Sequence, residues 1–183
     1  MLTDEQRATL LSLARQSLEA AARGAPLPQP TIDDEALTRP SGGFVTLKVQ
    51  ERLRGCIGLI EPLKPLYQTV IDMARSAALE DPRFPPVEPE EVPQIRIEIS
   101  VLSPPEPVED AAAEIEVGRH GLIVRKGPYS GLLLPQVPVE WNWDRDEFLA
   151  QTCTKAGLPR DAWREPGTEV QRFSAEVFRE QEA

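Results

Sequence analysis

Two stretches near the start of the chain repeat apolar residues at helical spacing. In the first, Thr3 and Gln6 form a capping-box pattern, and the apolar positions that follow share one helical face: Leu10, Ala14, Leu18 and Ala21. Gly24 ends this helix. The second stretch covers residues 66–79, and its expected buried stripe is Leu66, Val70, Ala74 and Ala77. The spacing therefore predicts amphipathic helices that cover a sheet.

Elsewhere apolar and polar residues alternate in short runs, the pattern of half-buried strands. Strands are predicted for residues 44–49, 53–60, 95–101, 114–117, 121–125, 131–134 and 173–177. Short turns at residues 50–52 and 127–128 favour antiparallel pairing, and Asp144 and Glu147 cap a further helix. Because no regular strand–helix–strand repeat is present, we expect an α+β fold with a largely antiparallel mixed sheet covered by helices.

The length of the chain and the positions of its prolines indicate how many domains it forms and where the connections lie. At 183 residues the length suits one domain, or one domain with a small lobe. The 19 prolines are about twice the average share and cluster between the periodic segments. Residues 25–41 are therefore expected to form a proline-rich connection, and residues 81–86 a rigid, extended loop.

Composition excludes several classes of function. Twenty basic and thirty acidic residues give a net charge of -10, which repels nucleic-acid phosphates and anionic lipid, so neither nucleic acid nor membrane is an expected partner. No apolar run is long enough to span a bilayer, and the N-terminus lacks the features of a signal peptide. We therefore expect a cytoplasmic protein whose two cysteines are reduced thiols.

The segment with the strongest chemical pattern is Leu53-Arg54-Gly55-Cys56-Ile57-Gly58. Strand alternation places Arg54, Cys56 and Gly58 on one face, and Leu53, Gly55, Ile57 and Leu59 on the other. Neighbours on one face lie about 6.5–7 Å apart, so Arg54 can bring its guanidinium close to the Cys56 sulfur. A fixed cation favours the thiolate, which is the reactive form. The alternative is that Cys56 is a small buried hydrophobe.

Gly55 and Gly58 weaken a strand, which suggests that something approaches the backbone closely. A ligand is one candidate. A tightly packed helix or a β-bulge is the other, and the sequence leaves both open.

Four polar residues are further candidates for ligand contact or proton transfer. Asp81 and Arg83 lie in the proline-stiffened loop, where they either serve function or merely cap the turn and pair with an acid. Glu98 and Ser100 share the polar face of their strand. They face the same cleft as Cys56 if the strands are neighbours, or form a solvated outer face.

His120, the only histidine, stands at a strand entry and is a candidate base for a thiol, although a turn histidine is more often simply exposed. Gln136 follows a strand end, where its amide could orient a ligand. Cys153 falls on the apolar stripe of its helix and is expected in the core. A set of Cys56, His120 and Cys153 lacks the close pairs of a metal site, and no phosphate-binding glycine loop is present, so no metal or cofactor is expected.

Several blocks of sequence occur in an order that is found in one family. They are Phe44-Val45-Thr46-Leu47, Leu53-Arg54-Gly55-Cys56-Ile57-Gly58, Asp81-Pro82-Arg83-Phe84, Glu98-Ile99-Ser100-Val101-Leu102, His120-Gly121-Leu122, Gly131-Leu132-Leu133-Leu134-Pro135-Gln136-Val137 and Lys155-Ala156-Gly157-Leu158. The chain resembles the AMMECR domain family over about residues 5–179. The resemblance implies a single AMMECR-like domain over residues 1–183, with a larger sheet-and-helix part and a smaller subdomain.

Bacterial and archaeal members of the family look like protein A of the AmmeMemoRadiSam system. The resemblance therefore implies a Memo-like protein and a radical S-adenosylmethionine enzyme as partners. It supplies no reaction, and it implies a site around Arg54, Gly55, Cys56 and Gly58.

Three functional hypotheses follow. The first is an enzyme, or a catalytic component, that uses Cys56 as nucleophile or redox thiol, with Arg54 holding the thiolate and His120 or Glu98 moving protons. The second is a non-catalytic module that binds an unidentified small molecule for the same pathway. The third is an interaction scaffold whose contact surface includes Trp141 and Trp143.

Overall fold

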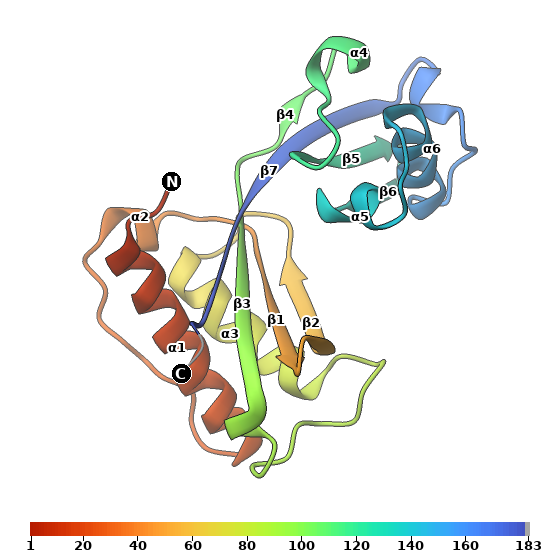
Figure 1. Ribbon diagram of the computed structural model, residues 1–183. Coiled ribbons are helices and arrows are strands. Elements are labelled where there is room, and N and C mark those ends of the chain that lie inside the picture. The colour runs from red at the N-terminus through yellow and green to blue at the C-terminus, as the bar shows by residue number, and fades with distance from the viewer. Residues whose placement is uncertain (182–183) are drawn as a thin grey trace. The chain divides into compact units, whose positions relative to one another are not determined.

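The computed structural model describes residues 1–181 and divides the chain into two compact units (Figure 1). Unit 1 comprises Met1–Leu102 and the C-terminal segment that begins at Glu176, and unit 2 comprises Ser103–Ala175. The hydrogen-bonded strand order is β2-β1-β3-β7-β5-β6, and β4 also pairs with β7. The α+β fold, with its largely antiparallel sheet and smaller subdomain, is thus confirmed.

Unit 1 packs two long helices on a sheet. Its elements are α1 (Asp4–Ala22), α2 (Glu35–Thr38), β1 (Gly43–Val49), β2 (Arg52–Leu59), α3 (Leu66–Leu79), a short 3-10 helix (Val92–Gln94) and β3 (Ile95–Leu102). Figure 1 shows α1 and α3 on one face of β1, β2 and β3. Both helices have the predicted extent, and the Thr3–Gln6 capping box is present. The core beneath them includes Leu10, Leu18, Val45, Leu47, Val70, Ala74, Ile97 and Ile99.

The last strand returns to unit 1 and is tied to the first helix. β7 (Glu169–Arg179) belongs to both units. The Glu176 carboxylate accepts a hydrogen bond from the backbone N–H of Leu2 at 3.0 Å and pairs with Arg7 at 2.7 Å. Glu180 accepts from the backbone N–H of Ile97 at 2.9 Å and pairs with Arg15. These contacts hold the C-terminal segment against α1 and β3.

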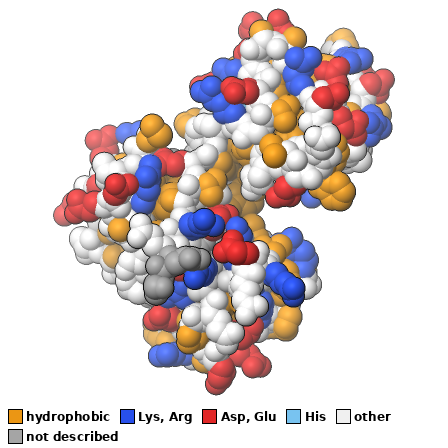
Figure 2. All heavy atoms as spheres, viewed as in Figure 1, with side chains coloured by type: hydrophobic (Ala, Val, Ile, Leu, Met, Phe, Trp, Pro, Cys, Tyr) orange, Lys and Arg blue, Asp and Glu red, His pale blue; other side chains and the backbone are white. Residues whose placement is uncertain are grey.

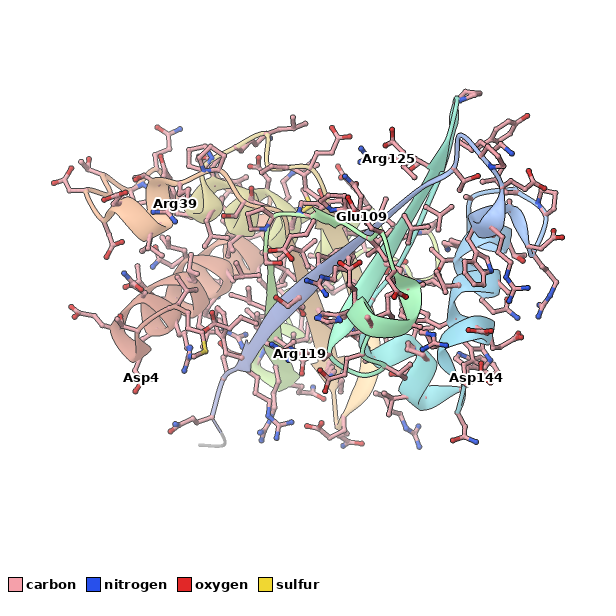
Figure 3. The ribbon with its side chains drawn as sticks, turned by 90° about the horizontal axis from the view of Figure 1, so that it is seen from above. Asp4, Arg39, Glu109, Arg119, Arg125 and Asp144 are labelled. Carbon is pink, nitrogen blue, oxygen red and sulfur yellow. The ribbon has the colours of Figure 1, made fainter. Side chains whose placement is uncertain are left out.

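Cross-strand pairing separates the two faces of the sheet in unit 1. Val45 in β1 is paired with Ile57 in β2 and Ile99 in β3, and this row lies against the helices. Thr46 is paired with Cys56 and with Glu98, so these three side chains form a row on the opposite face. Figure 3 shows the side chains from above, with Asp4 of α1 and Arg39 beyond α2 at the outer surface of the unit.

The hairpin of β1 and β2 contains an irregularity that the alternation did not predict. Gly55 is paired with Leu47 but Leu53 with Lys48, so Arg54 is the extra residue of a β-bulge. Leu53 and Gly55 therefore fall on opposite faces, and the prediction that they share one was wrong. Gln50 and Glu51, at φ 49° and 61°, form the two-residue turn between the strands.

Unit 2 consists of a small antiparallel sheet and short helices. Its elements are β4 (Glu106–Pro107), α4 (Ala111–Glu114), β5 (His120–Lys126), β6 (Tyr129–Leu133), α5 (Gln136–Glu140), α6 (Arg145–Lys155), a short 3-10 helix (Ala162–Arg164) and most of β7. The β5–β6 hairpin turns at Gly127, φ 55°, as predicted. Asp144 caps α6 by accepting from the backbone N–H of Glu147 at 2.8 Å.

One predicted strand is wrong. In place of a strand over residues 114–117, the chain forms α4 and then a turn. Asp110 caps α4 by accepting from the backbone N–H groups of Ala112 and Ala113, and the alanines that follow are strong helix formers. The apolar residue that suggested a strand, Ile115, is instead buried in the core of unit 2.

The surface carries charges of both signs over the face shown in Figure 2. Within residues 1–181, none of the helices has the combination of length and apolar character that a membrane span requires.

Candidate functional site around Cys56

The loop that follows α3 is fastened to β2 by Asp81, whose residue exposure is only 4 %. One carboxylate oxygen, Oδ2, accepts from the backbone N–H of Cys56 at 2.9 Å. The other, Oδ1, accepts from the backbone N–H of Arg83 at 3.0 Å. A single buried side chain thus joins the Asp81–Arg83 loop to the strand at Cys56.

The Arg83 guanidinium completes the pairing of Asp81. Its Nε donates to Oδ1 at 2.9 Å and its Nη2 to Oδ2 at 2.7 Å. Hydrogen bonding from Arg83 is the main reason that the pKa of Asp81 lies far below its usual value, and the backbone N–H groups of Cys56 and Arg83 lower it further. Both oxygens of Asp81 therefore accept two hydrogen bonds each.

Arg83 also reaches Cys56. Its Nη2 donates to the Cys56 carbonyl oxygen at 3.4 Å. The pKa of Arg83 is raised, first by the hydrogen bond to Asp81 and to a smaller extent by the charges of Asp81 and Cys56. Among the described residues, the guanidinium that contacts Cys56 is that of Arg83.

Cys56 directs its side chain to the sheet face away from the helices, and the residue as a whole is partly exposed. The Thr46 hydroxyl, on the paired residue of β1, donates a hydrogen bond to Sγ at 3.2 Å. Among the described residues, the side chain that hydrogen-bonds the sulfur is that of Thr46, and the Arg83 guanidinium contacts the carbonyl oxygen of the same cysteine.

Arg54 holds a different part of the chain. Its Nε and Nη2 donate to the two oxygens of Glu91 at 2.8 and 2.9 Å, and its guanidinium lies 5.9 Å from the centre of the Phe84 ring. The pKa of Glu91 is lowered chiefly by this hydrogen bonding. Arg54 thus connects β2 to the loop that contains Glu91. The catalytic role predicted for Arg54 stays a prediction.

The two glycines are explained by neighbouring parts of the protein. A Cβ on Gly55 would lie 2.2 Å from the backbone oxygen of Ala77 in α3. A Cβ on Gly58 would lie 2.2 Å from the ring of Phe44. A packed helix accounts for the first close approach and an aromatic ring for the second. Ligand contact by these glycines stays a prediction.

Glu98 and Ser100 share the sheet face of Cys56, but β1 separates their strand from β2. Two strand spacings amount to about 10 Å, so Glu98 does not reach the sulfur directly. Its carboxylate accepts from Lys48 Nζ at 3.0 Å. Ser100 is buried and paired with Phe44.

His120 and Gln136 belong to unit 2, whereas Cys56 belongs to unit 1. His120 Nδ1 accepts from the backbone N–H of Glu116 at 3.0 Å. Burial lowers the pKa of His120, and the charges of Arg172 and Arg119 lower it further. Gln136 is exposed at the start of α5. Cys153 is fully buried, as predicted, and burial raises its pKa.

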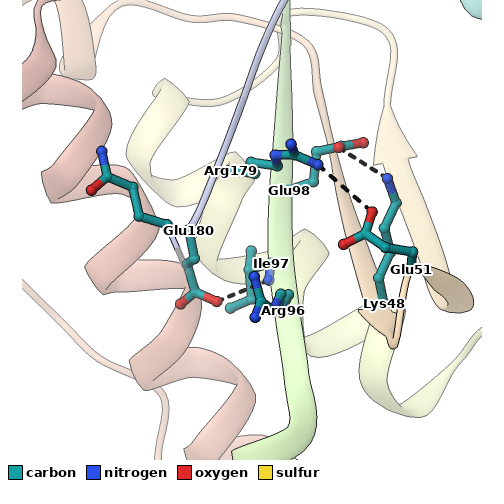
Figure 4. A pocket seen from close by; sticks show the side chains of 8 residues that line it. Lys48, Glu51, Arg96, Ile97, Glu98, Arg179 and Glu180 are labelled. Carbon is teal, nitrogen blue, oxygen red and sulfur yellow. Dashed lines mark hydrogen bonds and ion pairs between the residues drawn. The ribbon is translucent and has the colours of Figure 1, made fainter. Parts of the chain in front are cut away.

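A polar pocket of about 390 Å³ lies on unit 1 near the end of β7 (Figure 4). Its walls include two ion pairs, Lys48 with Glu98 at 3.0 Å and Arg179 with Glu51 at 3.6 Å. Sequence reasoning missed this pocket because its residues come from three separate segments of the chain, residues 48–51, 96–98 and 179–181. It also missed Thr46, which only the strand register places beside Cys56.

Comparisons with known proteins agree with this fold. A protein of Thermococcus gammatolerans is 52% identical over 190 residues, which cover 98% of this chain and 93% of that protein. A protein of Methanothermobacter thermautotrophicus is 49% identical, over 98% of this chain and 96% of that protein. The crystal structure of an uncharacterised protein from Pyrococcus horikoshii matches with a TM-score of 0.88 at 47% sequence identity, covering 98% of this chain and 94% of that one. Residues 11–178 match the AMMECR1 family, across both units. The chain belongs to the AMMECR1 family.

Proposed function

We propose that this protein is a ligand-processing component in which the sulfur of Cys56 acts as a nucleophile. The observation that carries the proposal is the environment of Cys56: the residue is partly exposed, its sulfur is hydrogen-bonded by Thr46 at 3.2 Å, and its carbonyl oxygen accepts from the Arg83 guanidinium at 3.4 Å. Arg83 takes the role first expected of Arg54, namely to favour the thiolate. Asp81 positions Arg83 and the Cys56 backbone together.

We take the partners from the family resemblance and the proton carriers, Glu98 and His120, from the sequence pattern around them. A Memo-like protein and a radical S-adenosylmethionine enzyme would supply or receive the ligand in a shared pathway. Glu98 lies on the same sheet face as Cys56 within unit 1 and is one of the two proposed proton carriers. His120 would act from unit 2.

The reactivity of Cys56 towards iodoacetamide tests this proposal. We expect Arg83→Gln to slow alkylation at pH 7 by about threefold to tenfold, because the thiolate loses a neighbouring cation. Thr46→Val removes one hydrogen-bond donor and should slow it by about twofold to threefold. Peptide-resolved mass spectrometry measures each rate at Cys56.

Two controls accompany this experiment. Arg52→Gln removes an equal charge from an exposed position on the same strand and should leave the rate within about twofold. Cys153 is fully buried and reports, in the same samples, whether the chain stays folded. An alkylation rate that is the same in Arg83→Gln and in the unaltered protein would refute the role proposed for Arg83.

A second candidate function is a protein-interaction module, and one observation in unit 2 favours it. Trp141 is exposed to 67% and stacks on Trp143, with ring centres 6.1 Å apart and planes at 18°. Exposed tryptophans are enriched among residues that dominate the binding energy of interfaces. The exposed Val139 lies in α5, next to this pair.

This candidate predicts that Trp141→Ala weakens binding to a purified Memo-like protein by at least about tenfold, because a central aromatic contact is lost. Isothermal titration calorimetry measures the change. Cys56→Ser and Leu63→Ala, the latter an exposed apolar residue of unit 1, should leave the affinity unchanged. Equal affinity in Trp141→Ala would rule out this surface as the contact.

A further inference from the structure

The guanidinium of Arg83 uses only two of its three nitrogens in hydrogen bonds to Asp81. Asp81 takes Nε and Nη2, while Nη1 has no hydrogen-bond partner within the part of the chain that the structure describes. The Arg83 side chain is 55% exposed, although Asp81 beneath it is almost fully buried. A buried carboxylate therefore fixes the group in place and leaves one edge of it facing outward, beside Cys56.

The neighbourhood keeps this cation oriented. The Phe84 ring centre lies 5.6 Å from Arg83 and 5.9 Å from Arg54, so one aromatic ring contacts both guanidinium groups. Arg54 is itself committed to Glu91. Within residues 1–181, the Nη1 of Arg54 also lacks a hydrogen-bond partner, but it is buried. The Arg83 side chain is 55% exposed, so Arg83 is the cation that a ligand can reach, and its Nη2 contacts the Cys56 carbonyl oxygen at 3.4 Å.

Charge argues for a specific class of ligand. The chain carries a net charge of -10, so it repels anions at long range, and an anion that binds requires a local, fixed cation. A guanidinium that is already positioned loses little freedom when it binds a carboxylate or phosphate. Arg83 meets both conditions.

We propose that the ligand which reaches Cys56 carries a compact oxoanion, a carboxylate or a phosphate, that binds the outward edge of the Arg83 guanidinium. The inference rests on the proposed function of Cys56. The reacting atom of the ligand would lie within a few bonds of the anionic group, because Arg83 also contacts the backbone of Cys56.

Two alkylating reagents that differ only in charge test this inference. Iodoacetate and iodoacetamide react alike: the Cys56 thiol loses its proton to water, the sulfur forms a bond to carbon, and iodide leaves. Iodoacetate has the carboxylate and iodoacetamide does not. The ratio of the two rates at Cys56 therefore reports anion binding, whereas the iodoacetamide rate alone reports the reactivity of the sulfur.

We expect the iodoacetate-to-iodoacetamide ratio to be about tenfold higher in the folded protein than in the urea-unfolded chain, as one charge-assisted hydrogen bond implies. Arg83→Gln should return the ratio to the unfolded value, and Arg83→Lys should retain part of it. Arg52→Gln, the matched control, should retain all of it. A folded-protein ratio equal to the unfolded one would overturn the inference.

A second test measures whether added anions protect Cys56 from alkylation. Because it uses the unaltered protein, it does not depend on the folding of a variant. Malonate and inorganic phosphate are the two probes, and each is added before iodoacetamide. We expect at least one of them to slow alkylation of Cys56 in a saturable manner, and the more effective probe identifies carboxylate or phosphate as the preferred group. If neither protects at concentrations up to about 100-fold above that of the reagent, the inference fails.

The failures of the two proposals are distinguishable. Cys56 could react fast with iodoacetamide while the iodoacetate-to-iodoacetamide ratio equals that of the unfolded chain and neither anion protects. This result would support Cys56 as a nucleophile and refute the anionic ligand. If Cys56 reacts more slowly with both reagents in the folded protein than in the unfolded chain, the proposed role of Cys56 as a nucleophile is refuted.

Discussion

Asp81→Asn is expected to lower the free energy of unfolding by about 2–4 kcal/mol, because it breaks a buried, charge-assisted network. Each Asp81 oxygen accepts two hydrogen bonds, Oδ1 from the backbone N–H and Nε of Arg83, and Oδ2 from the backbone N–H of Cys56 and Nη2 of Arg83. An asparagine amide must turn its NH₂ group towards two donors in either orientation. The loop then separates from β2, and alkylation of Cys56 should lose its dependence on Arg83.

The dependence of stability on pH gives an independent check on Asp81. Hydrogen bonding from Arg83 holds its folded-state pKa below the unfolded value of about 3.9. A depressed pKa contributes stability that is fully present above pH ~3.9 and is lost as the pH falls from there towards the folded pKa. The difference in stability between the unaltered protein and Asp81→Asn should therefore shrink below pH 4.

Urea unfolding at pH 7 and at several values down to pH 3 measures both effects. Asp34→Asn is the matched control, because Asp34 is an exposed N-cap of α2 and asparagine caps helices as well as aspartate does. Its cost should stay below about 0.5 kcal/mol. If Asp81→Asn costs no more than this control, the loop is not held by Asp81.

Gly55→Ala is expected to destabilise the protein by about 3 kcal/mol or more, because the added methyl group meets backbone atoms that have no room to move. The new Cβ would lie 2.2 Å from the carbonyl oxygen and 3.2 Å from the carbonyl carbon of Ala77. Relief requires α3 to move away from β2, which opens the core beneath Val70 and Ala74.

Thermal or urea unfolding measures this cost, with Gly127→Ala as the control. Gly127 has a left-handed backbone, φ 55°, but no atom lies within 4 Å of its added Cβ. Its substitution carries only the conformational cost of about 1–2 kcal/mol. A cost for Gly55→Ala as small as this would mean that α3 does not press on the strand.

Periodicity predicted the parts of the fold in which one apolar face is buried. The stripe of Leu66, Val70 and Ala74 gave the full extent of α3, and the alternation in residues 95–101 identified β3. It was wrong at residues 114–117, where a capping aspartate and a run of alanines outweigh a single buried isoleucine. It also missed α5, which follows Pro135 and contains a second proline. This helix is too short to show a repeating spacing of apolar residues.

The face on which Cys56 lies could not be derived by counting residues. From the turn at Gln50 and Glu51, a regular hairpin would pair Cys56 with Val45, whose side chain is buried under the helices. The bulge at Arg54 shifts the register by one residue, so that Cys56 is paired with Thr46 on the other face. The expectation that Cys56 shares a face with polar residues thus depends on one extra residue.

The cation that contacts the backbone of Cys56 could not be derived from the local sequence either. Arg54 is two positions from Cys56 and Arg83 is 27 positions away, yet Arg83 makes the contact. Both arginines lie near acidic residues, and only the fold decides that Glu91 pairs with Arg54 and Asp81 with Arg83. The sequence did indicate that Asp81 and Arg83 lie in a stiff loop with a candidate function.

We expect the Cys56 sulfur to be accessible and activated by its neighbours. The most direct measurement is its rate constant for alkylation by iodoacetamide at pH 7, compared between the folded protein and the same chain unfolded in urea. Activation by Arg83 and Thr46 predicts that the folded protein reacts at least about threefold faster at Cys56, while Cys153 is protected. A folded-state rate at Cys56 below that of the unfolded chain would contradict the claim, because it would show a thiol that is merely packed.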